Sequence, residues 1–340
     1  MSSALPRAGR FKKRRCCREV DQPVLDLRGV SKQYPGHLAV RDLSLTLRHG
    51  EFFSLLGPSG CGKTTTLRMV AGFEQPSAGE IYLRSERIDQ RRPYQRNVST
   101  VFQNYALFPH LTVQQNIEFG LRRQGVRNDL QKRVRDVLDL VQLGGKEARL
   151  PAQISGGERQ RVALARSLVL APDVLLLDEP LSALDPNLRK QVRTELKALQ
   201  RNVGITFLFV THDQEEALSL SDRMAVLSGG CLEQLGTPEE IYLRPSTRFV
   251  ASFLGSVNWM DGVGVRPEAV RLSAQAPDDV ARSLTVVVEQ LQFLGNSIHV
   301  QARMEAGEVI IAEISRFQAT YSPGDRLHAW WLPSDELRFE

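Results

Sequence analysis

A glycine-rich string at 57–64 contains the residue types best suited to hold a chain of phosphates. Its sequence, GPSGCGKT, matches the pattern G-x-x-x-x-G-K-[ST]. The glycines in this string permit a tightly curled backbone whose N–H groups face one anion. Lys63 adds a mobile positive charge, and the Thr64 hydroxyl can ligate Mg²⁺. This phosphate loop predicts a nucleoside triphosphate site whose residues are Gly57, Pro58, Ser59, Gly60, Cys61, Gly62, Lys63, Thr64 and Thr65.

A second string, ISGGERQR at 154–161, predicts the start of a helix. Ser155 and Glu158 have the S-x-x-E spacing of a capping box. The free N–H groups of such a helix start form a second anion site. Glu158 brings a carboxylate near that site, so we expect it to turn back to the helix backbone or to meet Arg159 or Arg161.

A third string, VLLLDEP at 174–180, places two carboxylates at the end of an apolar run. Such a run is typical of a parallel strand buried on both faces, and ligands bind beyond the carboxyl ends of such strands. Asp178 is therefore expected to hold Mg²⁺. Glu179 follows it directly and can act on a water molecule.

The elements around these strings are those needed to position them. An apolar strand is predicted at 50–56, with a helix from Thr64 that points its positive end at the phosphates. The segment LQKRVRDVLDLVQL at 130–143 has the apolar spacing of a helix. From Gly262 the pattern changes to short alternating or β-branched runs separated by Gly, Pro or Asp, which predicts a small all-β barrel.

In their order and spacing the three strings resemble those of the ABC ATPases, whose usual signature is LSGGQ. The resemblance implies a catalytic role for Glu179, which polarises the attacking water, and for Gln103, which touches both Mg²⁺ and water. It implies that His212 contacts the γ-phosphate and that Tyr34 stacks on adenine. The metal residues are then Thr64, Gln103 and Asp178, and the dimer seam is formed by Ser155, Gly156, Gly157, Glu158 and Asp185.

The same resemblance divides the chain into regions. Residues 1–22 form a basic tail, which we expect to be disordered or to precede the true start, although it could touch anionic lipid or nucleic acid. Residues 23–255 are expected to form an ABC ATPase domain of α/β type with a helical subdomain at about 104–170. Residues 256–340 resemble a TOBE domain, an OB-like barrel. Nucleic-acid binding by this barrel is not favoured, because Trp330 and Trp331 are adjacent and would face opposite sides of a strand.

The implied function is that of the ATP-hydrolysing subunit of an importer. The resemblance implies a homodimer that binds ATP and Mg²⁺, two integral-membrane permeases, an extracytoplasmic solute-binding protein and no nucleic acid. No apolar stretch approaches the roughly 18 residues that span a bilayer. The four cysteines show no disulfide or metal-ligand framework, as in a reducing cytoplasm. Attachment to the cytoplasmic face of the membrane is therefore expected to depend on the permeases.

The transported solute is the least constrained part of the prediction. Two stretches, at 98–113 and 194–223, look most like the polyamine (spermidine/putrescine) import ATPases. Ferric iron, phosphonate, sulfate and sugar importers remain alternatives. A non-transport ABC ATPase of DNA or ribosome metabolism is disfavoured, because the sequence lacks a long coiled coil between its motifs and a second ATPase copy.

Overall fold

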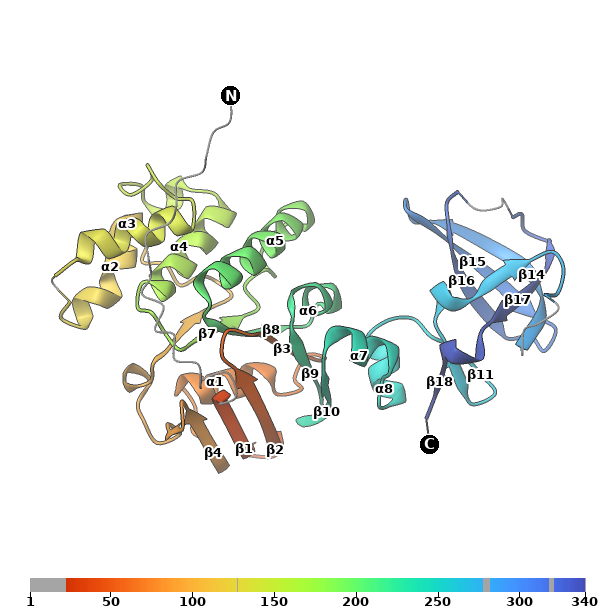
Figure 1. Cartoon of the computed structure of the whole chain (residues 1–340), viewed down its shortest axis with the longest axis horizontal. Helices are drawn as coiled ribbons and strands as arrows, with labels where there is room; N and C mark the ends of the chain where they lie inside the picture. Colours follow the sequence, from red (N-terminus) through yellow and green to blue (C-terminus); the bar gives the residue numbers. More distant parts are fainter. Residues whose placement is uncertain (1–22, 127, 278–281, 318–320, 340) are drawn as a thin grey trace, which may run out of the picture. The chain divides into compact units, whose positions relative to one another are not determined.

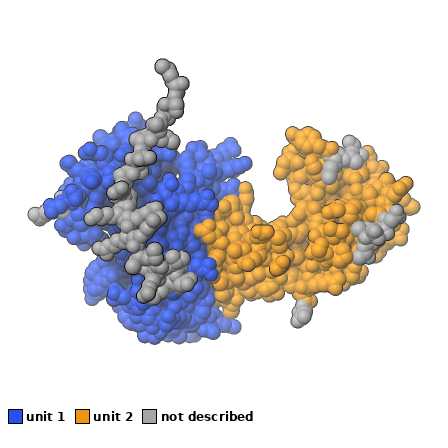
Figure 2. Space-filling view, in the orientation of Figure 1, with its two compact units in different colours: residues 1–53, 64–210 blue, residues 54–63, 211–340 orange. Residues whose placement is uncertain are grey.

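The chain divides into two compact units (Figure 2). The computed structural model describes residues 23–126, 128–277, 282–317 and 321–339, so the predicted basic tail at 1–22 lies outside the described residues. Of the described residues, those within 23–53 and 64–210 form the first unit, and those within 54–63 and 211–339 form the second. The second unit therefore includes most of the phosphate loop as well as the C-terminal region.

An antiparallel sheet forms one part of the first unit. Its spatial order is β2 (His37–Arg48), β1 (Pro23–Tyr34), β4 (Ala78–Leu83) and β5 (Glu86–Arg87). Leu43, Leu45 and Leu47 are buried while the residues between them are exposed. This alternation buries one face of the sheet in the core of the unit.

Parallel strands form the second sheet region of the first unit. β7 (Val174–Asp178) lies between β6 (Val98–Val101) and β8 (Thr206–Thr211) and pairs in parallel with both. The first four residues of β7 are buried, as the continuous apolar run predicts. The helices α1 (Lys63–Ala71) and α5 (Pro186–Val203) follow the phosphate loop and β7, respectively (Figure 1).

Three helices gather at one end of this unit in Figure 1. They are α2 (Val113–Arg123), α3 (Leu130–Leu140) and α4 (Gly156–Leu168), and α2 packs against both of the others. Short 3-10 turns lie at Pro93–Gln95 and Pro151–Gln153. On α2 the buried Val113, Ile117 and Leu121 recur every four residues, so one stripe of the helix faces its neighbours.

The second unit begins, after the phosphate loop, with a helix, a hairpin and two short helices. These are α6 (Gln214–Leu220), β9 (Arg223–Ser228), β10 (Cys231–Gly236), α7 (Pro238–Leu243) and α8 (Arg248–Phe253). A buried cluster joins α6, β9, α7 and α8 to Leu56, the last residue of β3 (Phe52–Leu56) before the loop. The loop and these helices therefore share one core.

The C-terminal part of the second unit is all-β, as the sequence predicts. One sheet has the order β11 (Asn258–Met260), β12 (Val263–Val265) and β18 (Glu336–Arg338). The other has the order β13 (Arg271–Ser273), β17 (Arg326–Trp331), β14 (Arg282–Phe293), β15 (Ser297–Met304) and β16 (Val309–Ser315), all antiparallel. Trp331 is buried in the core, whereas Trp330 lies under the Arg271 guanidinium, so the two rings face opposite sides.

Candidate functional site

The phosphate loop has a backbone that only glycine fits at its first position. A Cβ added to Gly57 would lie 2.3 Å from the Leu227 carbonyl oxygen and 2.6 Å from the Cys61 sulfur. Gly60 and Gly62 have φ values of +80° and +99°, a region that side-chain-bearing residues rarely adopt. The glycines therefore set the curl of the loop, and the loop leads directly into α1.

Lys63 lies inside this curl. Its ammonium donates hydrogen bonds to the carbonyl oxygens of Gly57 at 2.7 Å and Pro58 at 2.8 Å, and the residue is only 5% exposed. Burial raises the pKa of the neighbouring Cys61 thiol, although the Lys63 charge opposes this rise. Cys61 is thus a small neutral residue that fills the loop, and Lys63 supplies the positive charge.

Two of the predicted metal residues meet in the first unit. The Thr64 hydroxyl at the start of α1 donates to the Asp178 carboxylate at the end of β7, at 3.2 Å. Hydroxyl and carboxylate oxygens are ligands that Mg²⁺ prefers. These residues therefore have the donor set and the proximity that a magnesium site needs.

Glu179 is held in an unusual backbone conformation. Its φ is +45°, which a glutamate adopts only when the surroundings compensate for the strain. Its N–H donates to the Val210 carbonyl at 3.0 Å, and its carbonyl accepts from the Ser182 hydroxyl at 2.9 Å. The Gln103 amide in turn donates to the Ser182 oxygen at 3.0 Å. Ser182 thus links two predicted catalytic residues.

Sequence reasoning missed Ser182. The residue belongs to the string SALD at 182–185, of which only the final aspartate, Asp185, was predicted to be a site residue. Its position three residues after Glu179 was the available signal, since a serine there can bond back to the preceding backbone. Its bond to Gln103, 79 residues away in the chain, had no signal in the sequence.

The signature segment at 154–161 starts α4 as predicted. The Ser155 hydroxyl accepts from the Glu158 N–H, and the Glu158 carboxylate accepts from the Ser155 N–H at 2.7 Å, which confirms the capping box. The basic partner of Glu158 is Lys146 rather than either predicted arginine, and Arg161 bonds Glu195 at 3.0 Å. The bond from Lys146 and those from Ser155 lower the pKa of Glu158 to about 2.

Asp185, His212 and Tyr34 each lie at the end of a helix or strand. Asp185 caps α5 by accepting from the Leu188 N–H at 3.0 Å, and Pro186 begins that helix. His212 is exposed and precedes α6, which is capped by Asp213. Tyr34 ends β1, with the Lys32 ammonium 5.0 Å from its ring centre. The roles expected for these side chains toward a nucleotide stay predictions.

The loop after Gln103 is fixed from two sides. Tyr105 and Ala106 have φ values of +61° and +45°, and the Arg166 guanidinium of α4 bonds both of their carbonyl oxygens. The buried Asn116 amide bonds both the N–H and the carbonyl of Phe108, whose ring packs 4.5 Å from that of Phe119. These bonds hold the loop against α2 and α4 of the first unit.

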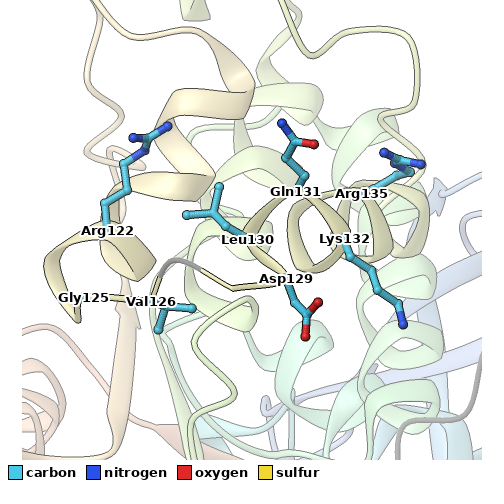
Figure 3. A pocket seen from close by; sticks show the side chains of 8 residues that line it. All are labelled: Arg122, Gly125, Val126, Asp129, Leu130, Gln131, Lys132 and Arg135. Carbon is cyan, nitrogen blue, oxygen red and sulfur yellow. The ribbon is translucent and has the colours of Figure 1, made fainter.

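A hollow of about 810 Å³ lies between α2 and α3 (Figure 3). Arg122 and Arg135 project to one side of it, whereas Asp129 and Lys132 project to the other. Arg122 is also paired with Glu118. The charged groups do not converge on one point, and none of the predicted site residues is among the described residues that line this hollow.

Comparison with known proteins identifies both parts of the chain. Residues 40–182 match the ABC transporter family model, and residues 263–339 match the TOBE domain model. The chain is 45% identical to the spermidine/putrescine import ATP-binding protein PotA of Acidothermus cellulolyticus, over 92% of this chain and 93% of that protein. For the PotA of Bacillus cereus the identity is 46% over 92% and 98%, and for that of Rubrobacter xylanophilus it is 44% over 96% and 97%.

Solved structures agree with this assignment. The cbiO1 protein from Clostridium perfringens, part of the ABC transporter complex cbiONQ, superposes with a TM-score of 0.61 at 28% identity, covering 65% of this chain and 91% of that one. The ATP-binding cassette MJ0796, solved as a dimer in a post-hydrolysis state with ADP and Pi, gives 0.55 at 30% identity over 63% and 98%. Among the residues that the structure describes, no helix is both long and apolar enough to cross a membrane.

These matches confirm the predicted fold class, an α/β phosphate-loop ATPase followed by an all-β region of the TOBE type. They also confirm that the chain binds and hydrolyses ATP. The chain belongs to the family of ABC transporter ATP-binding proteins that carry a TOBE domain.

Proposed function

We propose that this ATPase energises the import of polyamines, spermidine or putrescine, through a membrane transporter. The relatives named for that activity match more than nine-tenths of the chain. In this proposal residues 23–255 form the ATPase domain and residues 256–340 form a barrel that serves assembly or regulation. Two membrane permeases hold the ATPase at the cytoplasmic face, and an extracytoplasmic binding protein delivers the solute.

The observation that carries the nucleotide site is the rigid phosphate loop followed by the Thr64–Asp178 contact. We assign the phosphates to the N–H groups of residues 57–65 and to the Lys63 ammonium. Thr64, Asp178 and Gln103 would hold Mg²⁺, which neutralises phosphate charge when bound. Tyr34 is assigned to the adenine ring.

We assign the general-base role to Glu179. The strained φ, the two backbone hydrogen bonds and the link through Ser182 to Gln103 fix the start of this side chain. A carboxylate held in this way can orient a water molecule and accept its proton. His212 is assigned to the γ-phosphate, where an imidazole N–H can stabilise developing charge.

The second half of the site is assigned to another copy of the chain. The start of α4, with Ser155 and Gly157, would face the γ-phosphate held by the phosphate loop of the partner. The dimeric MJ0796 structure supports a homodimer, and Asp185 at the start of α5 would lie near the seam.

The coupling surface is assigned to the loop at 103–111. Because Arg166 and Asn116 hold this loop rigidly, a displacement at Gln103 would move Phe108 with it. Phe108→Ala should therefore depress transport in membranes far more than basal hydrolysis by the isolated subunit. Equal losses in both assays would show that Phe108 is only part of the local core.

The solute is tested by reconstitution. The ATPase is combined in proteoliposomes with the permeases and the binding protein encoded beside its gene. The proposal expects external spermidine or putrescine to stimulate hydrolysis and to be accumulated. Stimulation by ferric iron, phosphonate, sulfate or a sugar, with no response to polyamines, would contradict the substrate assignment and leave the importer assignment standing.

A further inference from the structure

Glu158 presents an electrostatic problem at the start of α4. Its carboxylate bonds the Ser155 N–H and thus lies at the helix start that the proposed function assigns to a γ-phosphate. Two anions at one helix start repel each other, and the repulsion increases as water is excluded from the interface. The usual signature has a neutral glutamine at this position. This chain, which has Glu158 there, therefore needs a positive charge that neutralises the carboxylate.

Lys146 is placed to neutralise the Glu158 carboxylate. Its ammonium pairs with the Glu158 carboxylate, and the two side chains are only 31% and 13% exposed. The segment that carries Lys146 is held by its own backbone bonds, from the Lys146 N–H to the Leu143 carbonyl at 3.2 Å and from the Arg149 N–H to the Lys146 carbonyl at 3.1 Å.

The same segment is tied to α2. The N–H groups of Val113 and Gln114 donate to the carbonyls of Arg149 and Glu147, at 2.8 and 3.0 Å. The lysine therefore arrives from a fixed connection rather than from a free surface loop. A cation on an ordered backbone neutralises the carboxylate with a smaller loss of backbone entropy than a cation on a mobile loop.

We propose that Lys146 is a positioning residue for ATP-driven dimerisation. It neutralises Glu158 and holds that carboxylate against the Ser155 N–H, so that the start of α4 remains able to accept a γ-phosphate from the partner copy. This inference rests on the composite site of the proposed function. It makes Lys146 necessary because position 158 is glutamate, and unnecessary when position 158 is neutral.

The test compares one substitution in two backgrounds. Lys146→Met is introduced into the Glu179→Gln protein, with and without Glu158→Gln, and Mg²⁺-ATP-driven dimerisation is followed by sedimentation. With Glu158 present, Lys146→Met should raise the ATP concentration for half-dimerisation about tenfold, because each dimer contains the contact twice. With Glu158→Gln present, the same substitution should change it by less than about twofold.

Three measurements separate positioning from a loss of structure. Lys146→Arg should keep dimerisation near that of the parent, because it retains the cation. Lys132→Met, an exposed lysine on α3, is the matched control and should have no effect on dimerisation. ATP affinity of the monomer, measured with a fluorescent analogue, should stay unchanged by Lys146→Met, because every residue assigned to that binding lies elsewhere.

The outcomes are distinguishable. Equal losses from Lys146→Met in both backgrounds would make the lysine a structural residue of the 141–150 connection and would overturn the inference, as would no loss in either. If the parent Glu179→Gln protein stays monomeric with Mg²⁺-ATP, the composite site itself fails, and the inference fails with it.

Discussion

The chain contains two glycine-rich helix starts, and only the first has a backbone that requires glycine. Before α1 the glycines provide conformation, since Gly60 and Gly62 have positive φ and Gly57 has no room for a side chain. Before α4 the backbone makes no such demand, because a Cβ on Gly156 or Gly157 would meet other side chains only at 3.8 and 3.4 Å, which are ordinary contact distances. Similar strings thus need not imply similar backbones.

The two helix starts also differ in the charged side chain that each contains and in the groups that it contacts. The phosphate loop carries a buried lysine whose bonds are to backbone oxygens. The start of α4 carries a glutamate whose charge is matched by Lys146 and whose carboxylate completes the cap. We assign the first start to the phosphates of the nucleotide bound by the same copy, whereas the second combines a cap with the site that we assign to the partner.

We expect the largest effect, a loss of turnover, from removing the proposed general base. This substitution separates ATP binding, which involves both helix starts, from ATP hydrolysis. Glu179→Gln should lower turnover by about 10²–10⁴-fold, the usual contribution of a positioned general base. ATP affinity should be retained, because the lost interaction matters mainly in the transition state. Turnover within about threefold of the unsubstituted protein would exclude this role for Glu179.

A side chain is excluded at the first helix start and tolerated at the second, which predicts a large effect of substitution at the first. Gly57→Ala should reduce ATP affinity by about two orders of magnitude, because the loop must shift to relieve the contact with the Leu227 carbonyl. Gly156→Ala is the matched control, and it should leave ATP affinity of the monomer unchanged. Similar affinities for both variants, measured by calorimetry on folded protein, would break the comparison.

The cap at the second start predicts a smaller effect on stability. Ser155→Ala removes the acceptor for the Glu158 N–H and should lower the free energy of unfolding by about 1 kcal/mol. Chemical denaturation of the two proteins measures this difference. Ser155→Asn retains a capping acceptor and should restore most of the loss, so equal destabilisation by both substitutions would argue against the cap.

The lowered pKa of Glu158 predicts how the free energy of unfolding depends on pH. Its pKa is lowered from 4.5 to about 2 in the folded chain, so its stabilisation is present above pH 4.5 and is lost as the pH falls through about 2. The stability difference between the unsubstituted protein and Glu158→Gln should therefore be largest above pH 4.5 and shrink on acidification. A difference that is constant over this range would contradict the charged contact.

The structural features that could be predicted from the sequence are those determined by residues close together in the chain. The curl at Gly57, the cap at Ser155 and the opposed faces of Trp330 and Trp331 all follow from local spacing, and the structure has each of them. Contacts between distant segments were not predictable. Ser182 bonds Gln103 across 79 residues, and Lys146 pairs with Glu158 from a separate connection.

The difference has a physical reason. Turns and caps are determined by φ, ψ and hydrogen-bonding groups within a few residues, so residue types at fixed offsets predict them. A charge partner for Glu158 could be any basic residue that the fold brings near. Sequence proximity favoured Arg159 and Arg161, but Arg161 is directed to α5, where it meets Glu195.

The central claim is that one active site is built from both helix starts, each from a different copy of the chain. Sedimentation of the Glu179→Gln protein tests it most directly. Mg²⁺-ATP should convert monomer to dimer, ADP should not, and adding Ser155→Arg should block the dimer while sparing ATP binding by the monomer. A protein that stays monomeric with Mg²⁺-ATP, while the unsubstituted protein hydrolyses ATP at a specific rate independent of protein concentration, would contradict the composite site.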